Sequence, residues 1–307
     1  MDKTKKGIAL FITLLIIASI LSIVAVSFSY LEKAHDDAGR SSALIQGNLL
    51  YQNTTDILKR IFPSGKSDST KLDILYTIPM MISDEKSGFM LSLNCKPLMV
   101  GVPIKWLNET FTKKTPAKNE LAYKILAYIY DTYEIKEPSA LEQKIAMEIS
   151  GIKEYSNDFE PRIKPNRGIV SKKQFDKILL EYRLEFDDVN VYKVPWERYF
   201  VFVDVSDKAV IDGEYLSAEL IAAAFDIPLS TVSESWVIDP ELNQKPTLKT
   251  FLQENGAMQS FDKKLFSEKG LNAMHCEETY AYRDGHYRFS FDYENERNRN
   301  FEFHGKL

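Results

Sequence analysis

An uninterrupted apolar run dominates the start of the chain. From Ile8 to Leu31 the sequence holds no charged residue, and leucine, isoleucine, valine, alanine and phenylalanine prevail. As a helix this run covers roughly 36 Å, and about 20 apolar residues suffice to cross a bilayer. The apolar core of a secretory signal peptide is shorter, about 7–15 residues, although Ala25-Val26-Ser27 offers a weak cleavage site. The pattern therefore predicts a transmembrane helix over residues 8–31.

The charges that flank this run predict its orientation. Lysines precede it at Lys3, Lys5 and Lys6, and acidic residues follow it at Glu32, Asp36 and Asp37. Basic residues tend to stay on the cytoplasmic side of a membrane. We therefore expect a cytoplasmic N-terminus and the rest of the chain on the opposite side. The remaining sequence contains no second apolar run of spanning length.

Helical spacing continues beyond the apolar run. No proline occurs before Pro63. Large apolar residues follow one helical stripe at Ile45, Leu49, Ile57 and Ile61, with Leu50 and Leu58 alongside. We expect one helix from Ile8 to Phe62, whose second half packs this stripe against another part of the protein.

Two periodicities alternate along the rest of the chain. Alternating apolar residues predict strands over residues 71–83, 88–94, 199–205, 286–293 and 301–307. Helical spacing predicts helices over residues 119–135, 139–152, 171–186 and 215–227, with Asn119, Ser139 and Ser171 as N-caps of the first three. In the strand over 286–293, four aromatic residues share one face: Tyr287, Phe289, Phe291 and Tyr293. Residues 239–269 are polar and weakly patterned, and we assign them no element.

The order of these elements predicts an α+β fold. A long N-terminal transmembrane helix would pack on an antiparallel sheet, and the helical block would be inserted between strands of that sheet. The net charge of −5 argues against a nucleic-acid partner. The two cysteines, Cys95 and Cys276, are far apart in sequence. They could form a disulfide outside the membrane, but nothing local pairs them, and two separate buried thiols are the favoured interpretation.

The sequence contains no recognisable catalytic motif. The four histidines, His35, His275, His286 and His304, are scattered, and no H-E-x-x-H, C-x-x-C, P-loop or G-x-S-x-G occurs. His275-Cys276 places a base beside a thiol, but adjacent residues seldom face each other, so we do not expect a cysteine nucleophile. The chain is expected not to be an enzyme.

The residues around Gly7 resemble a known processing signal. Lys5-Lys6-Gly7, followed directly by the apolar helix, resembles the class III leader of type IV pilins and type II secretion pseudopilins. The resemblance implies that a membrane peptidase cuts between Gly7 and Ile8 and methylates the new N-terminus. Glycine has no side chain that would keep the peptidase from the backbone. In this family the helix after the cut is the assembly element.

Ile12 departs from the usual pattern of that family. It is the fifth residue after the implied cut, where most members carry a glutamate that is thought to pair with the terminal amine of a neighbouring subunit. A carboxylate in lipid is costly unless it is paired. One minor pseudopilin type, the general secretion pathway protein K family, lacks this glutamate and carries an inserted helical domain, and the chain resembles it in both features. Asp212 and Glu214 would replace the asparagines of the family's Asn-x-Asn motif.

The resemblance implies a pilin-like fold and a non-enzymatic role in protein secretion. Its implied domains are a leader peptide (1–7), a transmembrane helix (8–31), a periplasmic extension (32–64), a β domain (65–112 and 199–307) and an inserted α-helical domain (113–198). The chain would be a minor pseudopilin at the tip of the type II secretion pseudopilus, initiating assembly and supporting export across the outer membrane. It would be anchored in the bacterial inner membrane with its main domain in the periplasm. Its partners would be other minor pseudopilins, of the I and J types, contacted through the N-terminal helix and the sheet.

Calcium is a further implication of the resemblance, because this family binds calcium in an acidic loop of its helical insert. Calcium requires about six to eight oxygen ligands. The acidic candidates are Asp131 with Glu134, or Asp158 with Glu160, and neither pair forms an EF-hand pattern. A solvated loop is the favoured interpretation of both pairs.

Two other functions remain open from the sequence. The chain could be a minor pilin of a type IV pilus or DNA-uptake machine, which the sequence hardly separates from a pseudopilin. It could also be a signal-anchored periplasmic domain with an uncut N-terminus, although the residues before the apolar run leave no room for the output domain of a sensor.

Overall fold

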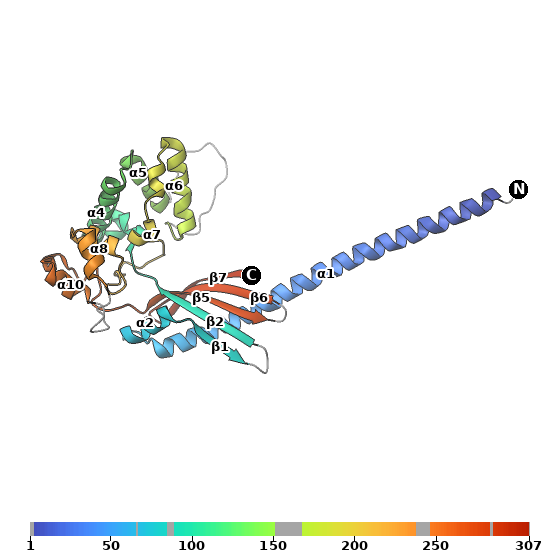
Figure 1. Ribbon diagram of the computed structural model, residues 1–307, viewed down its shortest axis with the longest axis horizontal. Helices are drawn as coiled ribbons and strands as arrows, with labels where there is room; N and C mark the ends of the chain where they lie inside the picture. The colour runs from blue at the N-terminus through green and yellow to red at the C-terminus, as the bar shows by residue number, and fades with distance from the viewer. Residues whose placement is uncertain are drawn as a thin grey trace.

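The computed structural model describes residues 3–65, 67–84, 89–150, 168–237, 246–282 and 285–306. It consists of a long helix, a five-stranded sheet packed on one half of that helix, and a helical part beyond the sheet (Figure 1). The α-helices are α1 (Lys3–Ile61), α2 (Ser69–Thr77), α3 (Glu109–Thr112), α4 (Pro116–Tyr133), α5 (Pro138–Ser150), α6 (Lys172–Phe186), α7 (Trp196–Tyr199), α8 (Ala218–Phe225), α9 (Leu229–Ser235) and α10 (Leu248–Glu254). The short 3₁₀ helices are η1 (Ile104–Leu107), η2 (Val189–Tyr192) and η3 (Met258–Ser260).

Helix α1 is continuous over 59 residues, as the absence of proline predicts. At 1.5 Å per residue it is about 90 Å long. Its first half projects away from the rest of the chain, and its second half lies along the sheet (Figure 1). The buried face of the second half consists of Ala43, Gly47, Leu50, Thr54, Leu58 and Phe62. These positions are three or four apart, so they form one stripe along the helix.

The sheet is antiparallel, in the order β1-β2-β5-β6-β7. Its strands are β1 (Met80–Asp84), β2 (Phe89–Pro97), β5 (Ala273–Tyr282), β6 (Gly285–Glu294) and β7 (Arg297–Lys306). The predicted strands over 88–94, 286–293 and 301–307 are confirmed, and the predicted aromatic face of β6 is buried against α1. Strand β5, at the centre of the sheet, was not predicted.

The first predicted strand is largely wrong, because residues 71–77 belong to α2. The Asp68 carboxylate caps this helix by accepting a hydrogen bond from the Lys71 backbone amide at 3.4 Å. Leu72 and Leu75 are buried, three residues apart, which is helical spacing. Pairing with β2 begins only at Met80.

Cys95 and Cys276 form a disulfide between β2 and β5, so the favoured interpretation of two separate thiols is wrong. The two residues lie directly opposite each other in the antiparallel register, with their Cα atoms 4.1 Å apart. The bond is buried and spans 181 residues of sequence. It therefore links the two ends of the long segment between these strands, which includes the helical part.

The helical part has its own core, which runs from Val102 to Phe266 in sequence. This extent corrects the expectation that residues 199–266 belong with the sheet, because Phe200, Leu220 and Phe251 belong to the same buried cluster as residues of α4, α5 and α6. The predicted strand over 199–205 is reduced to β4 (Phe200–Val201), which pairs in parallel with β3 (Val102–Pro103). Within residues 239–269, which were given no element, the chain forms α10 and η3.

The predicted helices of this part are present, but two of the three N-caps are not. Ser171 caps α6 by accepting a hydrogen bond from the Gln174 amide at 3.2 Å. Helix α4 begins instead at Pro116 and α5 at Pro138. Proline fits the first turn of a helix because the backbone N–H it lacks would have no partner there. The predicted helix over 215–227 is confirmed as α8.

Candidate functional site

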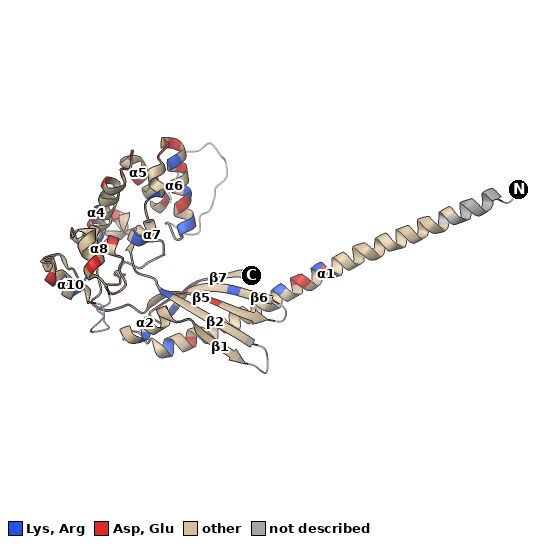
Figure 2. Ribbon diagram, in the orientation of Figure 1, with Lys and Arg blue, Asp and Glu red and all other residues tan. Residues whose placement is uncertain are grey.

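The first half of α1 exposes apolar side chains around its whole circumference. From Thr13 to Leu31 every side chain is exposed, among them large residues such as Leu21 and Phe28. Figure 2 shows that no charged residue interrupts this stretch. Within the described residues, α1 is the one helix long and apolar enough to cross a membrane. Such a surface is stable only in an apolar environment, so this half is a candidate membrane anchor.

Three serine hydroxyls of this stretch are satisfied within the helix. Ser19, Ser22 and Ser27 each donate a hydrogen bond to the carbonyl four residues earlier, at 2.9, 2.8 and 2.8 Å. A hydroxyl without a partner in hydrocarbon would cost several kcal/mol, by the range of about 2–7 kcal/mol for unpaired polar groups. These bonds let serine occur in the anchor without an outside partner.

Two tyrosines hold the second half of α1 on the sheet. Tyr280 of β5 donates a hydrogen bond to the Ala43 carbonyl, and Tyr293 of β6 donates one to the Phe62 carbonyl at 2.9 Å. Both rings are buried. The two contacts lie 19 residues apart, one within α1 and one at the residue that directly follows it, so they fix both the angle and the register of the helix. No signal in the sequence identifies this pairing, because it depends on strand register.

Ile45, Leu49 and Ile57 of the predicted apolar stripe face outward, whereas Ile61 and the flanking Leu50 and Leu58 pack against the sheet. Ile45 is 64% exposed and Leu49 is 51% exposed, and Leu44 and Ile57 are exposed as well. The stripe that covers the sheet combines the small residues Ala43, Gly47 and Thr54 with the larger Leu50 and Leu58. These outward residues form a second apolar stripe, which is separated from the anchor by the charged segment over residues 32–40 and is available to a partner.

The processing positions lie within α1. Gly7, Ile8 and Ile12 are helical, and their side chains are outside the described residues. Cleavage, methylation and the meaning of Ile12 therefore stay predictions.

One pair of the calcium candidates can be located. Asp131 and Glu134 lie at the C-terminal end of α4, and both are exposed. Glu134 adopts a left-handed backbone conformation, with φ of 53°, and its carbonyl accepts a hydrogen bond from Asn190 at 3.0 Å. Asp158 and Glu160 lie outside the described residues. Among the residues that are described, no three acidic, histidine or cysteine side chains gather as a metal site, and calcium stays a prediction.

Asp212 and Glu214 lie where the helical part meets the sheet. Asp212 is fully buried, and its carboxylate accepts hydrogen bonds from the backbone amides of Leu271 at 2.7 Å and Glu214 at 2.9 Å. Burial raises the pKa of Asp212 to about 7, against the opposing effect of these bonds. Between them, Gly213 approaches the Ser267 carbonyl so closely that a Cβ would lie 2.1 Å from its oxygen. Asp212 and Gly213 therefore hold the backbone in place where the helical part meets the sheet.

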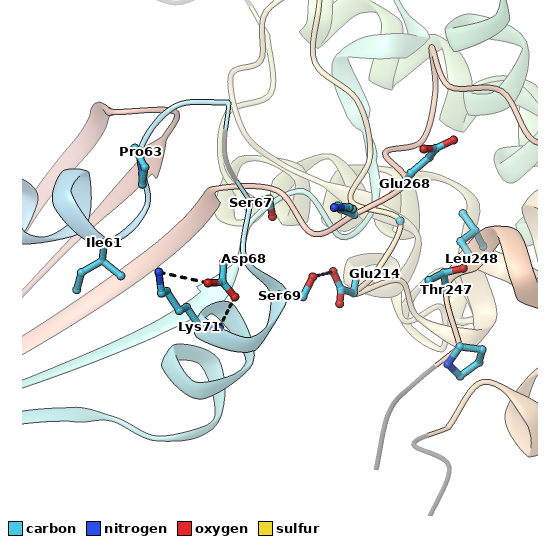
Figure 3. Close-up of a pocket in the computed structure, with 13 residues that line it drawn as sticks. Ile61, Pro63, Ser67, Asp68, Ser69, Lys71, Glu214, Thr247, Leu248 and Glu268 are labelled. Carbon is cyan, nitrogen blue, oxygen red and sulfur yellow. Dashed lines mark hydrogen bonds and ion pairs between the residues drawn. The ribbon is translucent and has the colours of Figure 1, made fainter. Parts of the chain in front are cut away.

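A cleft of about 570 Å³ opens at this junction, between α2, the loop at Glu214 and the start of α10 (Figure 3). Most of its charged groups have a polar partner nearby. Asp68 pairs with Lys71 at 3.2 Å, and the Glu214 carboxylate accepts a hydrogen bond from Ser69 at 2.7 Å. Glu268 pairs with Lys263 at 2.8 Å. The cleft offers a neutralised polar surface.

The histidines that sequence reasoning left unassigned form pairs on the sheet. His275 Nδ1 lies 2.7 Å from Asp292 Oδ1, and His304 Nε2 lies 2.8 Å from Ser290 Oγ. Asp292 thus contacts His275, whereas Ser290 contacts His304. These described residues therefore form no serine–histidine–aspartate relay. Cys276, beside His275, is bonded in the disulfide and so has no free thiol to act as a nucleophile.

The whole fold has a counterpart among solved structures. It is similar to a chain in the crystal structure of the GspK-GspI-GspJ complex from the enterotoxigenic Escherichia coli type 2 secretion system. The TM-score is 0.51, and the match covers 86% of this chain and 98% of that chain at 9% sequence identity. No protein-family model and no curated protein matches the sequence.

The likeness confirms the predicted fold. The α+β architecture, with its long apolar helix on an antiparallel sheet and its additional helices, is the one that the resemblance to the general secretion pathway protein K family implied. At 9% identity the likeness concerns the arrangement of the backbone. Of the sites described above, the exposed apolar surface of α1 is the strongest candidate for a functional site.

Proposed function

We propose that this chain is a minor pseudopilin of the K type, which caps and initiates the pseudopilus of a type II secretion system. The observation that carries the proposal is the fold shared with a chain of the GspK-GspI-GspJ complex over 98% of that chain's length. The role is structural: α1 anchors and assembles, and the sheet and helical part form the exposed end of the fibre.

Two independent features support a periplasmic main domain. The lysines before the apolar run and the acidic residues after it favour a cytoplasmic N-terminus. The buried Cys95–Cys276 disulfide lies in the sheet, on the other side of the anchor, and disulfides form and persist in the oxidising periplasm.

The position at the tip is supported by shape and by Ile12. The helical part lies at the end of the molecule opposite the N-terminus of α1 and extends well beyond the sheet (Figure 1). Such a volume is easier to place at the end of a fibre than inside it. Ile12 carries no carboxylate to receive the terminal amine of a subunit above it, and the last subunit needs none.

The proposed partners are minor pseudopilins of the I and J types. The outward stripe of α1, with Ile45 and Leu49, lies on the same helix as the apolar anchor, beyond the charged segment over residues 32–40. A neighbouring helix of the same kind could pack along both segments and bury them together.

Mass spectrometry of the N-terminal peptide, from membranes of the native host, tests the proposal. We expect a peptide that begins at Ile8 with an added methyl group, and an uncut chain in the variant Gly7→Val, whose side chain obstructs the peptidase. A wild-type chain that still begins at Met1 would leave a plain anchored domain. A start near Ser27 or Phe28 would make the protein a secreted one.

Deletion of the gene in the same host separates the secretion machine from a type IV pilus. We expect exported proteins to accumulate in the periplasm while surface pili remain. Loss of pili with normal export would instead identify a minor pilin.

A further inference from the structure

The two edges of the sheet are built differently. Strand β7 carries charged residues along its length, at Arg297, Arg299, Glu302 and Lys306. Its pairing with β6 is also irregular, with register shifts between Arg288 and Phe289 and between Ser290 and Asp292. Charges and irregular pairing are the usual devices that keep a free edge from adding another strand. The β7 edge is therefore protected.

The β1 edge carries one charged residue, Asp84, at its C-terminal end. Residues 74–83 contain no charge, and the register of β1 with β2 is regular over all of its paired positions. Met81 is 67% exposed, and Ile74 and Ile78, which precede the strand, are exposed as well. Pro79 lies before the first paired residue, so it does not interrupt the outer backbone groups of β1. Such an edge is a template for another strand.

The apolar surface extends from this edge onto the face of the sheet. Met81 lies opposite Ser92, and Met90 lies opposite Ser83, so the two methionines are diagonal neighbours on one face. Met90 is also exposed. A strand added beside β1 could cover Met81 with its own side chains while its backbone pairs with the edge.

We propose that β1 is extended by an uncharged strand of a neighbouring pilin-like subunit, so that the sheet continues across the subunit boundary. The inference rests on the proposed function. Unpaired backbone donors and acceptors are matched by an extended backbone, and the uncharged part of the edge, residues 80–83, favours a strand without charges, because a charge buried there would have no counterpart. Since the proposed function places one copy of this chain at the tip, the strand belongs to a different subunit.

Single-cysteine cross-linking in native membranes tests this pairing. Both native cysteines are bonded to each other, so one introduced cysteine is the only free thiol of the chain. Met81→Cys and Ser83→Cys report on the β1 edge. Glu302→Cys, exposed on the opposite edge, is the matched control, and Ile45→Cys reports on assembly through α1. A benzophenone attached to the introduced thiol inserts into nearby C–H bonds on irradiation, so it needs no lysine in the partner strand, and the cross-linked peptides are identified by mass spectrometry.

We expect Met81→Cys and Ser83→Cys to link to one segment of another minor pseudopilin, at positions that shift by about two residues, the strand repeat. Glu302→Cys should give at least fivefold less product. If Ile45→Cys links to a neighbour while Met81→Cys and Ser83→Cys do not, the β1 pairing is wrong and the proposed function stands. If none of the positions links to a pilin-like subunit, the proposed function fails, and the pairing with it.

A charge at the edge gives a functional readout. Met81→Lys should reduce export of secreted protein at least threefold, because lysine on an edge strand opposes pairing. Leu184→Lys, at an equally exposed leucine on α6, should leave export unchanged. Equal effects of the two substitutions would overturn the inference.

Discussion

From Thr13 to Leu31 the side chains of α1 are exposed on every side, whereas from Ala43 to Phe62 one face of the same helix is covered by the sheet. The first half is apolar all round and has no inward face. The second half buries a stripe that includes Ala43, Gly47 and Thr54, and it leaves Ile45 and Leu49 outside. The size of an apolar residue therefore does not show which face meets the core. The buried stripe also contains the large residues Leu50 and Leu58, so it mixes small and large side chains opposite the aromatic rings of the sheet.

The largest change in unfolding free energy should follow removal of the Cys95–Cys276 disulfide, which lies in the sheet beneath the second half of α1. The double variant Cys95→Ala/Cys276→Ala should lose about 5 kcal/mol of unfolding free energy, because the bond closes a very long loop. Denaturation of the full chain in detergent, followed by near-ultraviolet circular dichroism, measures this loss. Helicity of the anchor should persist. A reductant should destabilise the wild type and leave the double variant unchanged.

A matched pair of leucines compares the halves directly. Leu58→Ala should cost about 2–5 kcal/mol of unfolding free energy, because Leu58 is 0% exposed and its loss leaves a cavity under the helix. Leu21→Ala, at a residue 62% exposed in the anchor, should change it by less than about 0.5 kcal/mol. Equal losses would mean that the first half also packs on the folded chain.

Acidity should affect the second half through Glu278. This residue is 0% exposed, and its carboxyl accepts a hydrogen bond from Thr54 of α1 at 2.8 Å. Burial raises its pKa from 4.5 to about 7. The folded state thus keeps a proton that the unfolded chain loses, so unfolding free energy should fall between pH 4.5 and pH 7, by at most about 1.4 kcal/mol per unit.

Replacement of Glu278 isolates this contribution. In Glu278→Gln the decline over that interval should be smaller than in the wild type, and the variant should be the more stable protein at pH 8. Glu277→Gln, at the neighbouring position that faces away from α1, should keep the wild-type profile. Identical profiles for all three proteins, from denaturation at a series of pH values, would contradict a buried carboxyl.

The smallest effect should come from two glycines of α1. A Cβ on Gly47 would lie 3.0 Å from the Tyr280 hydroxyl, whose buried ring is fixed by its bond to Ala43, whereas nothing lies within 4 Å of Gly39. Gly47→Ala should cost about 1 kcal/mol despite better helix propensity. Gly39→Ala should stabilise by about 0.5–1 kcal/mol. Thermal unfolding of both variants checks the opposite signs.

Sequence patterns predicted the elements whose formation depends mainly on residues close together in the chain. The proline-free stretch before Pro63 predicted α1, and the alternation in residues 286–293 with the charged turn after it predicted β6 and β7. The long apolar helix on an antiparallel sheet followed from these elements, and the resemblance to a known family completed the fold.

What the sequence concealed depends on tertiary contacts. Strand β5 was missed because Glu278 occupies an inward position and breaks the expected alternation. The disulfide required the β2–β5 register that places Cys95 opposite Cys276. The outward stripe of α1 was assigned to the core because periodicity gives the spacing of a face but not its direction. The tyrosine contacts to Ala43 and Phe62 had no sequence signal.

The disulfide also defines a place where the fold can be exchanged. Pro97 and Met274 lie opposite each other, so the chain leaves the sheet and returns to it through neighbouring strands. Any domain whose ends lie close together could be grafted there without altering the strands or their order. The disulfide would hold the two attachment points on the sheet together, whichever domain is inserted between them.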